Sequence, residues 1–158
     1  FALDTCPYAE RLPNSIKFFQ CDIVATPFPD RFFDALTAIS AIEHIGLGFY
    51  GDPKYNDGDF KAMKEMKRIL KDQGLLYLTT VVGKSFTITP NNNCRIYDRN
   101  RLAQLTAPFI AEKQEYYAFI KNKWIKTSER VAMSRSLPSF ALVCLLLRPR
   151  THFLETSN

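Results

Sequence analysis

The sequence lacks long apolar runs, paired cysteines and clustered histidines. Its longest apolar run, Phe140 to Leu147, is far shorter than the roughly 20 residues that span a bilayer. The four cysteines stand far apart with no C-x-x-C pair, and one histidine among scattered acids is too little for a metal site. We therefore expect no membrane span, no zinc or disulfide framework, and a reducing, cytoplasmic compartment.

Basic residues exceed acidic ones, and the net charge of +5 would permit an acidic partner. The densest basic group, from Lys61 to Lys71, is interleaved with apolar residues at helical spacing, which indicates the solvated face of an amphipathic helix. No nucleic-acid reading motif is present, so no nucleic-acid partner is predicted. With 46% apolar and 23% charged residues in a chain of 158, one ordinary globular domain is expected.

Short apolar runs alternate with helical patterns along the first two thirds of the chain, which is the α/β signature. The run over 32–42 is almost continuously apolar and predicts a central strand buried on both faces. Asp57 or Asp59 begins a predicted helix to about Lys71, and Asp98 caps another. The other predicted strands cover 1–4, 16–22 and 75–82, with an antiparallel edge pair over 116–125 and 139–147.

Three acidic positions follow predicted strands, where ligands of open α/β sheets bind. Asp4 suits the hydroxyls of a nucleoside ribose, and Asp22 suits an adenine amino group with Ile23 over the ring face. The third position is Glu43, which precedes His44 and a loop of three glycines and a proline from Gly46 onward. Loops of this length inside a compact domain are usually functional.

A resemblance to class I S-adenosylmethionine-dependent methyltransferases, of the type 11-like kind, rests on motifs in the family's order. The stretch from Phe33 to Ile45 resembles the family's fourth-strand motif, which starts F-D, has a small polar residue near its end and closes on Glu-His. Residues 68–74, R-I-L-K-D-Q-G, are similar to its helix-to-strand turn, although Asp72-Gln73 replaces the usual Pro-Gly, and 139–147 is similar to its last strand. The longer string 42–53 resembles a poorly characterised subgroup.

The resemblance implies a Rossmann-like, doubly wound, mostly parallel sheet with an antiparallel C-terminal strand pair. The family's first strand and glycine-rich loop lie upstream of the strand matching Phe1 to Asp4, so residues 1–150 are identified as a partial, N-terminally truncated domain and 151–158 as a tail. The implied cofactor is S-adenosylmethionine. Its candidate ligands are the residues at three strand ends: Asp4, Asp22, Ile23, Ser40, Ala41 and Glu43.

The predicted reaction is methyl transfer to a small-molecule or saccharide-type acceptor. His44 is the candidate base because imidazole titrates near neutrality, with the alternative that His44 and Glu43 only organise their loop. Tyr50 and Asp52 are the candidate acceptor-binding residues.

Two other functions stay open: a non-catalytic, methyltransferase-like interaction module, and a nucleotide-sugar or nicotinamide enzyme of the Rossmann type. The aromatic stripe of Tyr116, Tyr117, Phe119 and Trp124 is interpreted as core and edge-strand packing, and no role is predicted for His152 in the tail.

Overall fold

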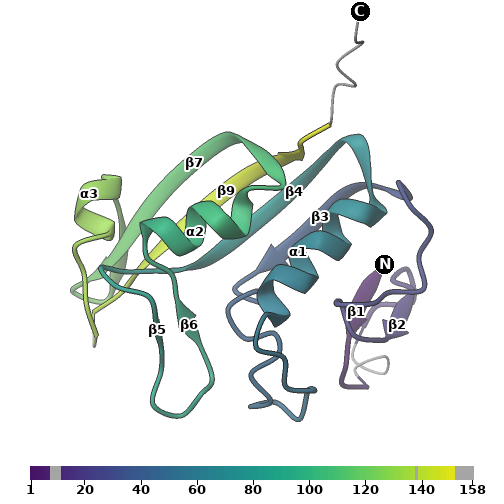
Figure 1. The fold of residues 1–158 in the computed structure, drawn as a ribbon, viewed down its shortest axis with the longest axis horizontal. Coiled ribbons are helices and arrows are strands. Elements are labelled where there is room, and N and C mark those ends of the chain that lie inside the picture. The colour runs from purple at the N-terminus through teal and green to yellow at the C-terminus, as the bar shows by residue number, and fades with distance from the viewer. Residues whose placement is uncertain (8–11, 138, 152–158) are drawn as a thin grey trace, which may run out of the picture.

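The computed structural model describes residues 1–7, 12–137 and 139–151 (Figure 1). The predicted tail beyond Thr151, with His152, lies outside the described residues. Five strands form the main sheet in the order β3, β4, β9, β7, β8, of which β3 and β4 are parallel and the other neighbours antiparallel. Their bounds are β3 (Phe33–Ile39), β4 (Leu70–Val82), β9 (Ala141–Pro149), β7 (Phe109–Ile120) and β8 (Lys123–Thr127).

A separate parallel pair, β1 (Ala2–Asp4) and β2 (Phe18–Gln20), stands beside β3 without pairing to it (Figure 1). Aromatic rings join the two sheets, with centroids 4.8 Å to 6.1 Å apart among neighbouring rings. The cluster comprises Phe1, Phe19, Phe28, Phe32 and Phe33. Phenylalanine packing, rather than a hydrogen-bonded ladder, therefore connects β1 to the main sheet.

The prediction that 32–42 is a central strand buried on both faces is wrong. β3 is an edge of the five-stranded sheet, and Asp34, Thr37 and Ile39 on it are exposed. Among the described residues only β4 pairs with β3, because β1 pairs with β2 instead.

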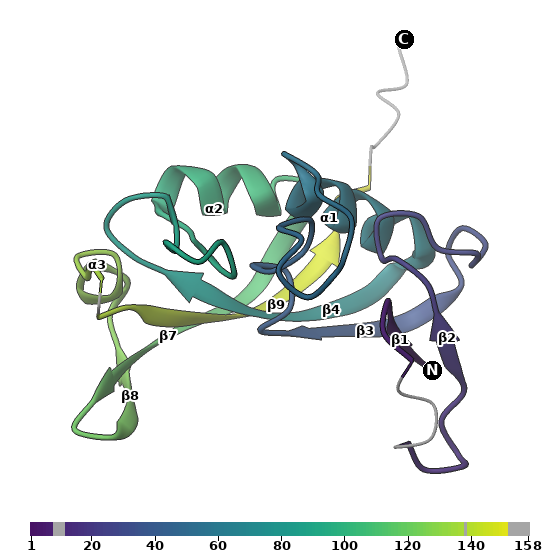
Figure 2. The ribbon, with the colours of Figure 1, turned by 90° about the horizontal axis from the view of Figure 1, so that it is seen from below.

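The two longer helices, α1 (Gly58–Ile69) and α2 (Arg99–Thr106), cover one face of the main sheet (Figure 2). α1 buries Ala62, Met63, Met66 and Ile69 at the spacing of one helical face, which confirms the predicted amphipathic helix. α2 begins as predicted, since the Asp98 carboxylate accepts from the amide of Arg101 at 2.8 Å. None of the helices in the described part is long and apolar enough to cross a bilayer.

The chain after Pro108 forms the predicted antiparallel pair, β7 with β9, and so confirms the α/β class with antiparallel C-terminal strands. Residues 116–125 are not one strand, however, because the chain turns at Lys121 and Asn122 into β8. A short helix, α3 (Glu129–Ala132), packs on β7, and a small hairpin pairs β5 (Thr87–Ile88) with β6 (Arg95–Ile96).

Candidate functional site

A cavity of about 680 Å³ is lined by β1 and β3 along their length, and it extends to the residues that follow β1, β2 and β3 and to the loop after β3. Its floor is apolar, from the phenylalanines between the sheets and from Met66 and Ile69 of α1. The cavity gathers every predicted site residue but Glu43, namely Asp4, Asp22, Ile23, Ser40, Ala41, His44, Tyr50 and Asp52.

Asp4 and Asp22 are held next to each other by the parallel pairing of β1 and β2, because the amide of Cys21 donates to the Asp4 carbonyl at 3.0 Å. Each carboxylate uses its Oδ1 atom to accept a backbone amide two residues on, from Cys6 at 2.8 Å and from Val24 at 3.0 Å. These local turns fix the side chains at the strand ends. They leave the two Oδ2 atoms for other partners, and that of Asp22 lies 3.4 Å from the Tyr55 hydroxyl.

Ser40 ends β3 in a left-handed conformation, with φ of 47°, which is uncommon outside glycine and asparagine. Its amide donates to the Thr79 hydroxyl of β4 at 2.9 Å, which stabilises the turn. The chain thereby leaves the sheet and places Ser40 and Ala41 on the cavity wall. Local strain of this kind clusters at functional sites.

Glu43 lies behind the cavity wall, 1% exposed, and does not line the cavity. Its carboxylate accepts a hydrogen bond from the Thr80 hydroxyl at 3.0 Å. Burial raises the pKa of Glu43 above its ordinary value. The geometry fits a residue that organises the loop rather than one that contacts a ligand in the cavity.

His44 is oriented by a main-chain oxygen from the β5–β6 hairpin, since its Nδ1 atom is hydrogen-bonded to the carbonyl of Asn93. A carbonyl only accepts, so Nδ1 carries a proton, and in the neutral imidazole this contact selects the tautomer with the lone pair on Nε2. Tyr50 packs edge-on against the imidazole, with ring centroids 5.5 Å apart. Burial raises the pKa of the neighbouring Cys94 to about 11, so its thiol stays protonated near neutrality.

The loop from Gly46 to Gly58 folds back on itself at the cavity mouth. The Gly46 amide donates to Asp52 Oδ2 at 2.9 Å, and the Gly46 carbonyl accepts from Tyr55 at 2.9 Å. Gly46 has a φ of 78°, and a Cβ on Gly58 would come within 2.7 Å of the Ile45 carbonyl oxygen, so the two glycines permit this contact. Asp52 Oδ1 is buried without a hydrogen-bond partner among the described residues.

Behind the loop lies a buried charged cluster, formed by Asp59, Arg95, Tyr97 and Arg101, that sequence reasoning missed. Asp59 is fully buried and accepts from the Tyr97 hydroxyl at 3.2 Å and from Arg101 at 3.2 Å. Arg95, 2% exposed, lies 3.8 Å from the same carboxylate and donates to the Ile45 carbonyl at 2.7 Å. Arg95 lies 36 residues after Asp59 in the sequence, so no short sequence pattern links the two residues.

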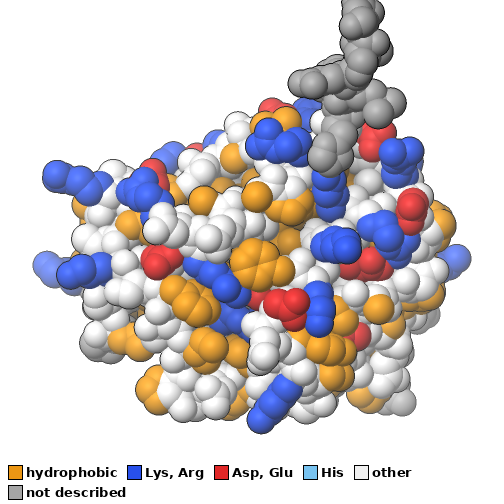
Figure 3. All heavy atoms as spheres, in the orientation of Figure 1, with side chains coloured by type: hydrophobic (Ala, Val, Ile, Leu, Met, Phe, Trp, Pro, Cys, Tyr) orange, Lys and Arg blue, Asp and Glu red, His pale blue; other side chains and the backbone are white. Residues whose placement is uncertain are grey.

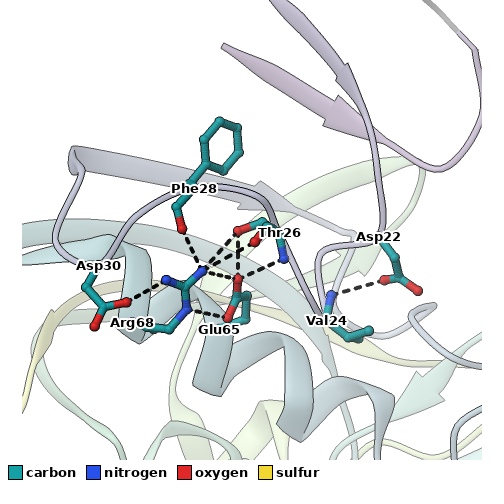
Figure 4. A network of polar contacts seen from close by, with 7 residues as sticks. All are labelled: Asp22, Val24, Thr26, Phe28, Asp30, Glu65 and Arg68. Carbon is teal, nitrogen blue, oxygen red and sulfur yellow. Dashed lines mark hydrogen bonds and ion pairs between the residues drawn. The ribbon is translucent and has the colours of Figure 1, made fainter.

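A second network ties the loop after β2 to α1 (Figure 4). Arg68 donates to Glu65 at 2.6 Å, to Asp30 at 2.6 Å and to the Phe28 carbonyl at 2.8 Å. Glu65 also accepts from the amide and the hydroxyl of Thr26, at 2.8 Å and 2.6 Å. Arg68 and Thr26 lower the pKa of Glu65 to about 2. Arg68 belongs to the motif resembling the helix-to-strand turn, and here it has a structural role.

The chain matches a known protein family and shares its fold with solved structures. The profile of the family described as "Caenorhabditis protein of unknown function, DUF268" matches residues 15–147. The chain belongs to this family. A search of curated protein sequences finds no match.

Solved structures share the fold at low sequence identity. A Burkholderia thailandensis 1,6-didemethyltoxoflavin N1-methyltransferase, with its substrate and S-adenosylhomocysteine bound, superposes with a TM-score of 0.62 at 13% identity, over 95% of this chain and 60% of that one. A Methanosarcina mazei S-adenosylmethionine-dependent methyltransferase gives 0.61 at 12% identity, over 93% and 80% of the two chains. The protein therefore has the Rossmann-like fold of class I methyltransferases and spans 60% of the Burkholderia enzyme.

A Streptomyces coelicolor geranyl diphosphate C-methyltransferase, in complex with magnesium, geranyl diphosphate and S-adenosylhomocysteine, gives a TM-score of 0.56 at 13% identity, over 85% of this chain and 52% of that one. The molecules bound together with S-adenosylhomocysteine in the Burkholderia and the Streptomyces structures differ in size and charge. At such identities the likeness concerns the fold alone.

Proposed function

We propose that this chain supplies the cofactor and acceptor pocket of an S-adenosylmethionine-dependent methyltransferase for a small hydroxylated acceptor. One observation carries the proposal: in a methyltransferase fold, the cavity reaches the carboxyl ends of β1, β2 and β3, and there it brings Asp4, Asp22 and His44 together. In open α/β sheets ligands bind at this edge.

The lining of the cavity fits a nucleoside. Asp4 would accept hydrogen bonds from the ribose hydroxyls, and Asp22 would accept one from the adenine amino group. Ile23 supplies an apolar side chain beside Asp22 for the ring face. The volume of about 680 Å³ is within the range of small-molecule pockets, roughly 300 to 1,000 Å³.

When bound, the cofactor supplies a methyl group on a positively charged sulfonium, ready for in-line displacement. The chain's own residues position the acceptor and remove its proton. His44 suits this role because Asn93 holds the tautomer in which Nε2 is free to take a proton. His44 Nε2 would take the proton of the acceptor oxygen or nitrogen, and the cofactor, held by Asp4 and Asp22, would supply the methyl group that replaces this proton and would be released as a neutral thioether.

The acceptor end of the pocket is polar. Asp52 and Tyr50 line this end from the same loop. Asp52 Oδ1 has no hydrogen-bond partner among the described residues but is buried, so the side chain would turn toward the cavity to accept from a hydroxyl or amine donor. A hydroxylated compound of saccharide type matches this pair, because it brings several donors to a site that has an unused carboxylate oxygen.

Titration of S-adenosylhomocysteine into the purified chain, followed calorimetrically, tests the cofactor assignment. We expect saturable binding that weakens about tenfold in Asp4→Asn or Asp22→Asn, since each loses a charge-assisted hydrogen bond. Asp34→Asn, an exposed aspartate on β3 outside the cavity, is the control and should bind as the wild type does. If the folded wild type does not bind even when it is extended upstream through the strand and glycine-rich loop that the resemblance implies, or binds a nicotinamide dinucleotide instead, the assignment is wrong.

Substitution of His44 by glutamine tests the base. We expect turnover to fall by about 10² to 10⁴ and the rise of rate with pH to disappear, with S-adenosylhomocysteine affinity unchanged. An acceptor for this assay comes from a screen of hydroxylated compounds with labelled S-adenosylmethionine. Unchanged turnover and an unchanged pH profile in His44→Gln would leave the residue only its role in organising the loop.

A further inference from the structure

The β7–β8 hairpin projects from the end of the sheet opposite to β1 and β2, on the side away from α1 and α2 (Figure 2). Its turn residues, Lys121 and Asn122, both have left-handed φ values, of 47° and 61°. Two such residues make a tight hairpin turn whose twist matches that of the strands. The tip is therefore a defined structure rather than a loose loop.

Large apolar side chains are exposed on both faces of this tip. Neighbouring residues of a strand point to opposite faces, so Phe119 and Trp124, which are cross-strand partners, share one face, and Ile125 lies on the other with Ile120. Their exposed fractions are 47% for Phe119, 38% for Ile120, 45% for Trp124 and 47% for Ile125. Tyr116 is buried, and Phe119 and Trp124 pack on each other at the sheet edge with ring centroids 5.1 Å apart, as predicted for the aromatic stripe, but nearly half of each of these two side chains stays exposed.

Positive charge surrounds the same tip. Residues 119–140 contain five basic residues and one acidic residue, a net charge of +4 where the whole chain carries +5. Lys121 and Lys123 have no carboxylate partner in residues 1–7, 12–137 and 139–151, whereas Lys126 pairs with Glu115 at 2.9 Å. In Figure 3 Lys and Arg side chains project from the end of the molecule that carries α3 in Figure 1.

We propose that the β7–β8 tip is a peripheral membrane anchor, which inserts Phe119, Ile120, Trp124 and Ile125 at the interface of an anionic bilayer. A hairpin tip with exposed apolar side chains on both faces can bury all of them in a bilayer, because the lipids surround the tip. A protein partner would cover only one face. Tryptophan favours the membrane interface because its ring is apolar and its N–H polar. Lys121 and Lys123 then lie at the level of the anionic headgroups.

A nucleic acid is the competing partner, because aromatic rings and lysines also bind single strands. The two isoleucines argue against it, since aliphatic side chains offer bases no ring to stack on. The cavity lies at the other end of the sheet (Figure 1), so the anchor would hold the enzyme at a surface without covering the cavity.

The fluorescence of Trp124, the chain's single tryptophan, reports insertion directly. The full chain is titrated with phosphatidylcholine vesicles, with vesicles in which one third of the lipid is phosphatidylserine, and with single-stranded DNA. We expect a shift of emission to shorter wavelength and co-sedimentation with the anionic vesicles only, weakened by salt. No shift with either vesicle, an equal shift with both, or a response to DNA alone would overturn the proposal.

Matched variants separate insertion from general charge and from folding. Lys121→Gln with Lys123→Gln should weaken binding to anionic vesicles by about fivefold per lysine, whereas Lys17→Gln with Lys64→Gln removes the same charge elsewhere and should change it little. Ile125→Ser should weaken binding at least tenfold, and Ile110→Ser, equally exposed at the other end of β7, should not. Equal losses in test and control variants would overturn the proposal.

Discussion

Two sets of acidic side chains behave in opposite ways in this protein. Glu65 and Asp59 are buried, and both carboxylate oxygens of each accept hydrogen bonds, from arginines, a threonine or a tyrosine. Asp4 and Asp22, at the strand ends, each use one carboxylate oxygen to accept a backbone amide, and the second oxygen of Asp22 has only a 3.4 Å contact with the Tyr55 hydroxyl among the described residues. The contrast separates acids that hold the fold from acids that are available to a ligand.

The structural acids also share a location behind the cavity wall, where they connect elements distant in sequence. Asp59 joins the start of α1 to β6 and α2, and Glu65 joins α1 to the loop after β2. The backbone amides that Asp4 and Asp22 accept come from residues two positions along the chain, and the one distant contact is the 3.4 Å approach of the Tyr55 hydroxyl to Asp22 among the described residues. Removal of a structural acid should therefore affect stability first, and removal of a cavity acid should affect binding first.

The largest effect is expected at Asp59. Asp59→Asn leaves the buried Arg95 without its countercharge, which should lower the free energy of unfolding by about 3 to 5 kcal/mol in urea denaturation. Asp57→Asn, two residues away, removes only an exposed, solvent-screened pair with Lys61 at 3.0 Å and should lower the free energy of unfolding far less. Similar losses for the two variants would show that the buried cluster contributes no more to the free energy of unfolding than the exposed pair does.

A smaller loss is expected at Glu65. Glu65→Gln weakens charge-assisted hydrogen bonds to Arg68 and Thr26 and should cost about 1.5 to 3 kcal/mol in the same assay. Glu112→Gln, which disrupts a more exposed pair with Arg148 at 2.7 Å, is the matched control and should cost under about 1 kcal/mol.

The pH dependence of stability sharpens the Glu65 result. Its folded pKa of about 2 lies below the ordinary 4.5, so its contribution is fully present above pH 4.5 and is lost as the pH falls toward 2. Glu115 has a folded pKa of about 2 as well, so the curve of the wild type alone does not isolate Glu65. The difference in stability between wild type and Glu65→Gln should shrink across this window, and a constant difference would contradict the assignment.

The smallest stability effects are expected at the cavity acids. Asp4→Asn and Asp22→Asn keep an oxygen that accepts the backbone amide, so each should change the free energy of unfolding by less than about 0.5 kcal/mol. The same proteins should lose cofactor affinity about tenfold. A large loss of stability in either variant would place that aspartate with the structural acids and remove the contrast.

Much of this arrangement was predictable because it depends on short stretches of chain. Apolar runs that end on Asp4 and Asp22 locate the strand ends, and the periodicity from Ala62 to Ile69 locates α1. The edge position of β3 was not predictable, since the order of strands depends on contacts between distant segments. The turn at Lys121 and Asn122 was missed because it contains neither glycine nor proline.

The sequence also could not predict which residues from distant segments contact the loop after β3. Arg95 and Thr80 contact the loop after β3 from positions about 50 and 37 residues further along the chain. The resemblance of the motif from Phe33 to Ile45 assigns Glu43 to the cofactor together with Ser40 and Ala41, but residues along an irregular segment can face different ways, and Glu43 faces away from the cavity.

The contact between His44 and the carbonyl of Asn93 has a consequence for how related sequences should be read. Because the hairpin contributes a main-chain oxygen, the identity of residue 93 can drift while the contact survives, provided the turn keeps its path. That path depends on Thr89, whose amide donates to the Cys94 carbonyl at 2.9 Å and whose hydroxyl accepts from the Cys94 amide at 3.1 Å. The orientation of the imidazole thus depends on the conformation of the turn and not on the side chain at position 93. Variation of residue 93 among related sequences would therefore not mean that the contact is lost.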